Sequence, residues 1–326
     1  MLTRRKFLLN STQTLTGLAG LYALPSLANA KLSYTLWGAP VGVSTLLAAT
    51  QYTDLATKYN IDTKLWKGPD QLRVGVVNGT MPLCMVPSYV AANFYNQGQA
   101  VRFMNIMTWG LLYIVSKDGN VQSLEDLKGK KLVMPFKNDM PDLVLQTLCK
   151  KANISLQNDA DVTYTAVPPE AAGLLLNGQA DCALLPEPAA SMAVIRGKAE
   201  GLTMQAALSL QDVWGALIGP NARIPQAGLM VTQEFYDNNA AFIADLNTAL
   251  PQALDWVNKN PTDAAQLGSK LLSIPAPILA HSLPLSNLTI TPTLDAKDEI
   301  LGFYQSLFEL NPKIVGGKMP DAGLFI

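Results

Sequence analysis

The chain has little histidine, cysteine or charge. Its 326 residues include one histidine and three cysteines, charged residues make up only 15%, and the formal net charge is −1. A lone His281 cannot supply the paired imidazoles typical of zinc sites, and Cys84, Cys149 and Cys182 are too scattered to form a disulfide framework. No polybasic stretch could face phosphate backbones, so nucleic acid is not an expected partner. We expect no metal, no cofactor and no catalytic residue.

Long apolar runs are also lacking after residue 30, so no membrane-spanning segment is predicted there. Residues 1–30 have the features of an export signal. Arg4 and Arg5 precede a Phe-Leu-Leu run, a mildly apolar stretch covers residues 15–27, and Ala28-Asn29-Ala30 is a small-x-small cleavage site. The adjacent arginines are typical of the twin-arginine route.

Two other interpretations of residues 1–30 are open, an ordinary secretory signal and an N-terminal anchor. Pro25 and Ser26 interrupt the apolar stretch, which disfavours the anchor, and no cysteine follows the cleavage site to carry a lipid. Cleavage would remove three basic residues and no acid, which changes the net charge from −1 to −4. We therefore predict a periplasmic protein that is soluble once its signal is cleaved.

Strand-like runs alternate with segments of helical spacing, which predicts an α/β architecture with largely parallel sheets. Each expected strand ends in a turn of Gly, Pro or small polar residues, and ligands of such sheets collect at the carboxyl ends of strands. Two successive sets predict two lobes, with chain crossings near residues 111–115 and 229–231. The expected strands are 32–37, 61–66, 81–86, 130–134, 161–167 and 180–185, and the expected helices are 44–58, 71–77, 141–151, 170–177, 234–238, 240–259, 262–272 and 296–310.

Four segments resemble a known family. Residues 121–133 (VQSLEDLKGKKLV) resemble the entry to the second lobe of type II solute-binding proteins, and residues 176–188 (LNGQADCALLPEP) resemble their Glu-Pro segment. Residues 253–265 resemble the late helix pair of that group, and residues 318–321 its C-terminal signature. The nearest branch is the nitrate/sulfonate/taurine and thiamine-pyrimidine-precursor (NMT1-like) group of periplasmic ABC transporter proteins.

The resemblance implies a two-lobe fold with mixed sheets flanked by helices and a hinge of two crossing strands. Lobe 1 would comprise residues 31–112 and 228–326, and lobe 2 residues 113–227. A small organic or anionic solute, such as a sulfonate or an aromatic or heterocyclic compound, would bind in the cleft by hinge closure. The implied partners are this solute and an inner-membrane ABC permease with its ATPase; a monomer without enzymatic activity is expected.

Candidate ligand-binding residues of the first lobe follow its predicted strands. Trp37 could lie against a flat ligand and Gly38 follows it, although Trp37 could equally be a core aromatic. Lys67 could meet an anion or simply be solvated. Ser88 opens a helix, where its hydroxyl can cap and free backbone N–H groups can hold an anion or a carbonyl.

The remaining candidates lie at the crossing and in the second lobe. Trp109 precedes the first crossing, and Trp214 near the return crossing could be a second aromatic wall. Glu187, between two prolines, could accept a hydrogen bond from an amine or ring nitrogen, or could only tie loop N–H groups together. The loop after the first strand of lobe 2 contributes Phe136, Lys137 and Asn138.

Two other functions are open. A sensory protein that feeds a membrane receptor could use the same pair of lobes. A pyrimidine synthase of this fold, the less favoured alternative, would need an active-site histidine and a cysteine cluster in the cytosol. His281 and the dispersed cysteines disfavour such an enzyme.

Overall fold

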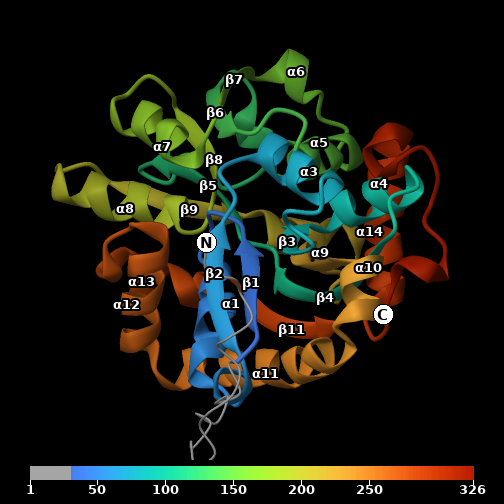
Figure 1. The fold of residues 1–326 in the computed structure, drawn as a ribbon. Helices are drawn as coiled ribbons and strands as arrows, with labels where there is room; N and C mark the ends of the chain where they lie inside the picture. The colour runs from blue at the N-terminus through green and yellow to red at the C-terminus, as the bar shows by residue number, and fades with distance from the viewer. Residues whose placement is uncertain (1–30) are drawn as a thin grey trace, which may run out of the picture.

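The computed structural model describes residues 31–326, which form two mixed β-sheets flanked by helices (Figure 1). Sheet A has six strands in the order β11-β4-β10-β3-β1-β2, and sheet B has five in the order β7-β6-β8-β5-β9. The strands of sheet A are β1 (Ser33–Gly38), β2 (Asn60–Leu65), β3 (Leu83–Pro87), β4 (Val101–Trp109), β10 (Pro225–Thr232) and β11 (Leu288–Pro292). Those of sheet B are β5 (Leu112–Lys117), β6 (Lys131–Pro135), β7 (Asp161–Thr165), β8 (Cys182–Pro186) and β9 (Met204–Ser209).

Strand composition matches strand position. β3 and β8 are short apolar runs with both faces covered, so they lie inside their sheets. β2 alternates exposed and half-buried residues and β7 is largely polar, and both lie at sheet edges where one face meets solvent. The parallel pairs β1/β2, β1/β3, β6/β7 and β6/β8 place the carboxyl ends of these strands at the edge of each sheet that faces the other sheet.

Helices cover both sheets. Several of them begin with proline in the first turn, where its missing N–H costs nothing. In Figure 1 the green and yellow-green helices of residues 140–199 surround sheet B in the upper half, and the orange helices of residues 240–285 lie below. The helices are α1 (Ser44–Ala49), α2 (Leu55–Lys58), α3 (Pro69–Val77), α4 (Ser88–Asn96), α5 (Met140–Lys151), α6 (Leu156–Asp159), α7 (Pro168–Leu176), α8 (Ala189–Ala199), α9 (Leu210–Ile218), α10 (Gln233–Asn238), α11 (Ala240–Lys259), α12 (Pro261–Leu272), α13 (Ala276–Leu285) and α14 (Lys297–Leu310). Short 3-10 turns are η1 (Thr50–Tyr52), η2 (Glu125–Leu127), η3 (Pro312–Val315) and η4 (Ala322–Leu324).

The chain passes between the sheets twice. It leaves sheet A at the end of β4 and enters sheet B at β5 through Gly110, whose φ of +81° is a left-handed conformation that glycine adopts without strain. It returns between α9 and β10. We call the elements around sheet A lobe 1 and those around sheet B lobe 2. The predicted type II, two-lobe α/β fold is confirmed, while the lobe boundaries at residues 112/113 and 227/228 remain a prediction.

The structure differs from the sequence-based elements in several places, and β4, α8, β9 and α9 lie where no element was expected. The single helix expected over residues 44–58 is broken into α1, η1 and α2, because Thr53 adopts an extended conformation. β11 was not expected; it pairs antiparallel with β4 at the edge of sheet A. Within residues 31–326, no helix combines the length and apolar character needed to cross a membrane. The predicted export signal lies outside the described residues.

Candidate functional site

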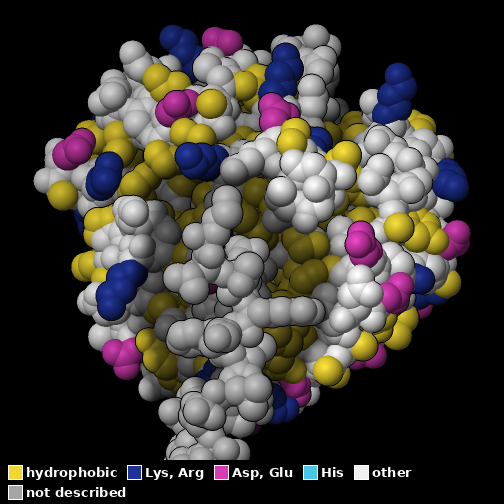
Figure 2. All heavy atoms as spheres, in the orientation of Figure 1, with side chains coloured by type: hydrophobic (Ala, Val, Ile, Leu, Met, Phe, Trp, Pro, Cys, Tyr) yellow, Lys and Arg dark blue, Asp and Glu magenta, His cyan; other side chains and the backbone are white. Residues whose placement is uncertain are grey.

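Two cavities that abut one another lie between the lobes. The inner cavity has a volume of about 80 Å³ and the outer one about 430 Å³. Val41 and Pro186 line both. In Figure 2, hydrophobic side chains fill the visible part of the recess between the lobes, and charged side chains stand around its rim.

The inner cavity is built by residues that follow strand ends. Lobe 1 contributes Ala39 after β1, Trp66 after β2 and Pro87 at the end of β3, while lobe 2 contributes Phe136 after β6 and Pro186 at the end of β8. Such loops meet at the carboxyl edges of the sheets, which is where α/β sheets bind ligands. The site is therefore shared by both lobes.

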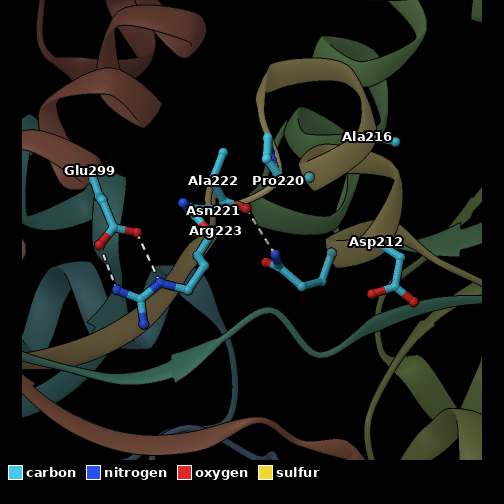
Figure 3. A pocket seen from close by; sticks show the side chains of 9 residues that line it. Asp212, Ala216, Pro220, Asn221, Ala222, Arg223 and Glu299 are labelled. Carbon is cyan, nitrogen blue, oxygen red and sulfur yellow. Dashed lines mark hydrogen bonds and ion pairs between the residues drawn. The ribbon is translucent and has the colours of Figure 1, made fainter.

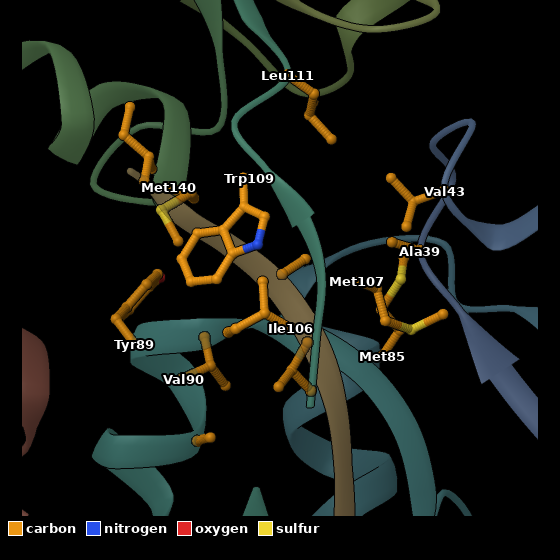
Figure 4. Close-up of a cluster of buried hydrophobic side chains, with 14 of the residues drawn as sticks. Ala39, Val43, Met85, Tyr89, Val90, Ile106, Met107, Trp109, Leu111 and Met140 are labelled. Carbon is orange, nitrogen blue, oxygen red and sulfur yellow. The ribbon is translucent and has the colours of Figure 1, made fainter. Parts of the chain in front are cut away.

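The aromatic walls of the inner cavity are held by the backbone. Trp66 is buried, and its indole N–H donates to the Met85 carbonyl at 3.0 Å, which fixes the ring. Phe136 has a φ of +61°, and its N–H donates to the carbonyl of Thr165 on β7. A positive φ at a bulky residue is uncommon and marks functional loops. Figure 4 shows buried side chains near the cavity, with Met140 beside the Trp109 ring.

Asp139 links the lobes beside the inner cavity. Its Oδ1 accepts from the Tyr89 hydroxyl of lobe 1 at 2.6 Å and from the Met140 N–H at 2.7 Å. Its Oδ2 lies 3.9 Å from a guanidinium nitrogen of Arg73. Burial raises the pKa of the Asp139 carboxyl, although these three neighbours partly oppose that shift. The Tyr89–Asp139 pair is thus a buried hydrogen bond between the lobes.

Gln226 is the other polar side chain on the wall of the inner cavity. It is 5% exposed, and its buried Oε1 atom has no hydrogen-bond partner among the described residues. The pairing of β10 with β4 shifts register between Pro225 and Ala227, which places Gln226 in a bulge. Bulges re-aim side chains near binding sites, and Gln226 lines the cavity.

The outer cavity is larger and carries charge. Lys67 and Arg196 line it together with Glu187, which is 1% exposed. Ser191 of α8 donates its hydroxyl to Glu187 at 2.9 Å and also lies 2.9 Å from Nδ1 of His281 on α13. Burial raises the pKa of the Glu187 carboxyl, against the hydrogen bonds from Ser191. Through Ser191, lobe 2 makes a further contact with lobe 1.

Three of the predicted site residues lie in the two cavities: Phe136 in the inner one, and Lys67 and Glu187 in the outer one. Ser88 follows the cavity-lining Pro87 and is completely buried, and its hydroxyl has no partner among the described residues. Its carbonyl accepts from the Tyr304 hydroxyl at 2.7 Å.

The other six predicted residues do not line either cavity. Trp109 is buried with the Arg223 guanidinium 3.9 Å from its ring centroid, and Trp214 packs edge-on against Phe303 in the core. A Cβ on Gly38 would come within 2.4 Å of the Ser44 hydroxyl, so only glycine fits there. Of the rest, Trp37 lies beside Lys64, Lys137 over Tyr164, and Asn138 in a separate side pocket with Arg73.

A third hollow, of about 830 Å³, lies between α9 and α14 (Figure 3). Its main charges pair with each other, because Arg223 donates to both carboxylate oxygens of Glu299 at 2.9 and 2.5 Å. Arg223 also stacks on Trp109. Trp109 ends β4 just before the first crossing and Arg223 precedes β10 on the return, so this cluster joins the two passages of the chain between the sheets. Asp212, which also lines the hollow, is in no ion pair among the described residues.

Sequence reasoning missed Met140, Gln226 and the Tyr89–Asp139 pair. Asp139 follows the predicted site loop of residues 136–138, and Tyr89 follows Ser88 at the start of α4, but their pairing across the lobes has no signal in the sequence. Gln226 carries no motif, because its place depends on a bulge between strands about 120 residues apart in sequence. Trp66 and Met140 could have been found by asking which apolar residues come directly after strands.

The comparisons with known proteins agree on the architecture. Residues 95–264 match the model of a family described as NMT1/THI5 like. No curated protein matches the chain by sequence. Among solved structures, an ABC transporter protein from Parabacteroides distasonis is similar, with 18% identity, a TM-score of 0.72, and coverage of 91% of this chain and 99% of that one.

Two solved sulfonate-binding proteins are similar as well. The periplasmic aliphatic sulphonate binding protein SsuA from Escherichia coli has 15% identity and a TM-score of 0.69, with 90% of this chain and 92% of that one covered. The alkanesulfonate-binding protein SsuA from Xanthomonas axonopodis pv. citri, solved with bound MOPS, has 15% identity and a TM-score of 0.67, with 91% and 98% covered. At these identities the likeness shows the fold.

Proposed function

Because this chain belongs to the NMT1/THI5-like family, we propose that it is the solute-binding component of an ABC importer, which captures a small solute between its two lobes. One observation carries the proposal. Loops that follow strands of both sheets converge on a largely apolar cavity, and its wall includes Gln226, whose buried Oε1 has no partner among the described residues. The similar solved structures are described as binding or transport proteins.

Capture would proceed by hinge closure around the solute. Several contacts join the two lobes, among them Tyr89 to Asp139 and Ser191 to His281, and these two would break when the lobes part. The hinge would lie at Gly110 and at the return crossing before β10. A ligand held by both lobes favours the closed state by its differential affinity for that state.

The proposal places the mature protein in the periplasm, exported through the twin-arginine-like signal of residues 1–30 and acting as a monomer. An inner-membrane permease with its ATPase would accept the solute. Binding and release need no chemical step.

A thermal-shift screen of the mature chain tests this function. The panel comprises alkanesulfonates, nitrate, aromatic carboxylates, and neutral amides and amino-heterocycles. A ligand at 100-fold its Kd adds about 2.7 kcal/mol, and each kcal/mol raises Tm by roughly 2–4 °C for a chain of this size. We expect one chemical class to stabilise the protein.

Two variants test whether the ligand that raises Tm binds in the inner cavity. Ala39→Leu fills the inner cavity and should remove the ligand-induced shift. Ala244→Leu makes the same change on an exposed position of α11 and should keep it. No stabilisation by any class, or an undiminished shift in Ala39→Leu, would contradict the proposed function.

A further inference from the structure

The return passage of the chain is held to lobe 2 by one side chain, Gln211 in the first turn of α9. Its Nε2 donates to the Ala222 carbonyl at 3.1 Å, and its Oε1 accepts from the Ile224 N–H at 2.8 Å. Ile224 is completely buried, so the loss of this acceptor would be costly. Because Ser209 both ends β9 and caps α9, the helix follows sheet B without a break. The backbone between Ala222 and Ile224 should therefore move with lobe 2.

Gln211 also lies against the first passage. A Cβ built on Gly110 would come within 2.9 Å of the Gln211 Cβ, so the open side of the glycine faces this side chain. Trp109 and Pro225 are partners in the pairing of β4 with β10, so Gly110 and Ile224 leave sheet A side by side. One amide of lobe 2 thus meets both passages where they leave lobe 1.

Arg223, between the two backbone groups that Gln211 holds, makes its side-chain contacts with lobe 1. Its guanidinium lies 3.9 Å from the Trp109 ring centroid and donates to both carboxylate oxygens of Glu299 on α14 (Figure 3). α14 is fixed in lobe 1, where the Tyr304 hydroxyl donates to the Ser88 carbonyl at 2.7 Å. The side chains of Arg223 and Glu299 are 42% and 33% exposed, so water can solvate both when they separate. Of the contacts that hold this passage, the ion pair can break at the lower cost.

The ion pair belongs to the state in which the lobes touch, because the hydrogen bond from Tyr89 to Asp139 is formed in the same structure. The hollow beside the pair shares no lining residue with the inner or the outer cavity. A solute in those cavities therefore does not contact the pair. A contact that favours the closed state from outside the site changes the apparent affinity through the fraction of molecules that are closed.

We propose that the Arg223–Glu299 pair, positioned by Gln211, is a hinge contact that sets the closed fraction of the protein and so its affinity for a solute it does not touch. The proposal rests on the proposed function and adds a means of tuning it. Bidentate arginine–carboxylate pairs are stronger than single ion contacts, but this one is partly exposed. Removal of the Glu299 charge should therefore raise the Kd about three- to fivefold.

The first experiment compares Glu299→Gln with Asp298→Asn. Both remove one negative charge from the first turn of α14, but Asp298 is exposed and does not pair with Arg223. Isothermal titration of each mature variant uses nitrate, methanesulfonate, benzoate and benzamide. Every probe that binds the parent should bind Glu299→Gln more weakly by the same factor, and Asp298→Asn with the parent's Kd. Equal Kd values for the two variants, or factors that differ between probes, would overturn the proposal.

The variant Gln211→Met tests the positioning residue. Methionine keeps the length of the side chain and removes both hydrogen bonds to the return passage, so Arg223 is no longer fixed to α9. In this background Glu299→Gln should change the Kd by less than about twofold. An undiminished effect of Glu299→Gln would show that Gln211 does not position the pair.

A measurement without solute separates the hinge contact from the proposed function. Spin labels at Gln179→Cys of lobe 2 and Gln266→Cys of lobe 1 lie at exposed positions, and the three native cysteines are buried. In double electron–electron resonance, Glu299→Gln should lose population at the interlobe distance of the structure, whereas Asp298→Asn should match the parent. An unchanged distribution in Glu299→Gln would overturn the hinge contact even where solutes bind. Binding of none of the four probes, with the distribution shifted, would count against the proposed function and leave the hinge contact standing.

Discussion

The two cavities between the lobes differ in almost every property that matters for recognition. The inner one is small, apolar and without a cation, and Gln226 on its wall lies in a strand bulge. The outer one is about five times larger, and Lys67 and Arg196 lie on its wall with Glu187. A polar contact in a buried apolar site discriminates strongly, whereas exposed charges are screened by water and salt. We expect selectivity to come from the inner cavity.

The two cavities also differ in how firmly their side chains are held. Residues of the inner cavity are fixed by backbone hydrogen bonds and by Asp139, whereas Lys67 of the outer cavity is an exposed side chain. Substitutions in the inner cavity should therefore affect both folding and binding, and substitutions of outer cations should affect binding weakly. The following predictions test this difference, from the largest expected effect to the smallest.

Removal of the Trp66 ring should have the largest effect. Trp66→Ala leaves a void in a buried wall and should lower the free energy of unfolding by about 3–5 kcal/mol. Urea denaturation at pH 7 measures the change. Trp66→Phe, which keeps most of the packing and loses the hydrogen bond to Met85, should cost less. A Trp66→Ala variant as stable as the parent would show that the Trp66 ring does not pack tightly in the wall of the inner cavity.

Loss of the buried hydrogen bond between the lobes comes next. Tyr89→Phe keeps the ring and removes the donor to Asp139, and a hydrogen bond to a charged group contributes about 1.5–3 kcal/mol. Chemical denaturation should show a loss of this size. Tyr52→Phe at an exposed tyrosine is the matched control and should change stability little. Equal stability of both variants would contradict the role of this contact.

The raised pKa of Asp139 gives a pH dependence of defined sign. Because the folded-state pKa lies above the unfolded value, Asp139 contributes stability below the unfolded pKa of about 3.9, and this contribution is lost as pH rises through the folded-state pKa. The free energy of unfolding of the parent, relative to Asp139→Asn, should fall as pH rises above the unfolded pKa of about 3.9. A difference that stays constant or grows with pH would contradict this sign.

The outer cations should matter least. Lys67→Ala should raise the ligand Kd less than about fivefold, because an exposed ion contact contributes about 0–1 kcal/mol. The effect should shrink further in 0.5 M salt. Titration of the parent and the variant with the same ligand, at low salt and in 0.5 M salt, measures the change in Kd and its dependence on salt. A loss much larger than about fivefold would contradict the proposed division between the cavities.

Much of the fold could be predicted from the sequence because it depends on local patterns. The apolar runs at β3 and β8 and the proline-led helices α3, α5 and α7 are readable without neighbours. The break at Thr53 and the edge strand β11 were missed, because each depends on packing against segments distant in sequence.

The site was predictable only in outline. Loops after strands indicated Phe136, Lys67 and Glu187, which do line the cavities. The tryptophans were ambiguous, since an indole in such a loop can wall a cavity, as Trp66 does, or fill the core, as Trp214 does. Gln226 could not be found, because the bulge that aims it exists only once β10 pairs with β4.

A crystal structure of the mature chain with the tightest ligand of the screen tests the central claim most directly. We predict that the ligand lies between Trp66 and Phe136 in the inner cavity. Ligand density in the hollow beside Arg223 and Glu299, with both interlobe cavities unchanged, would contradict it.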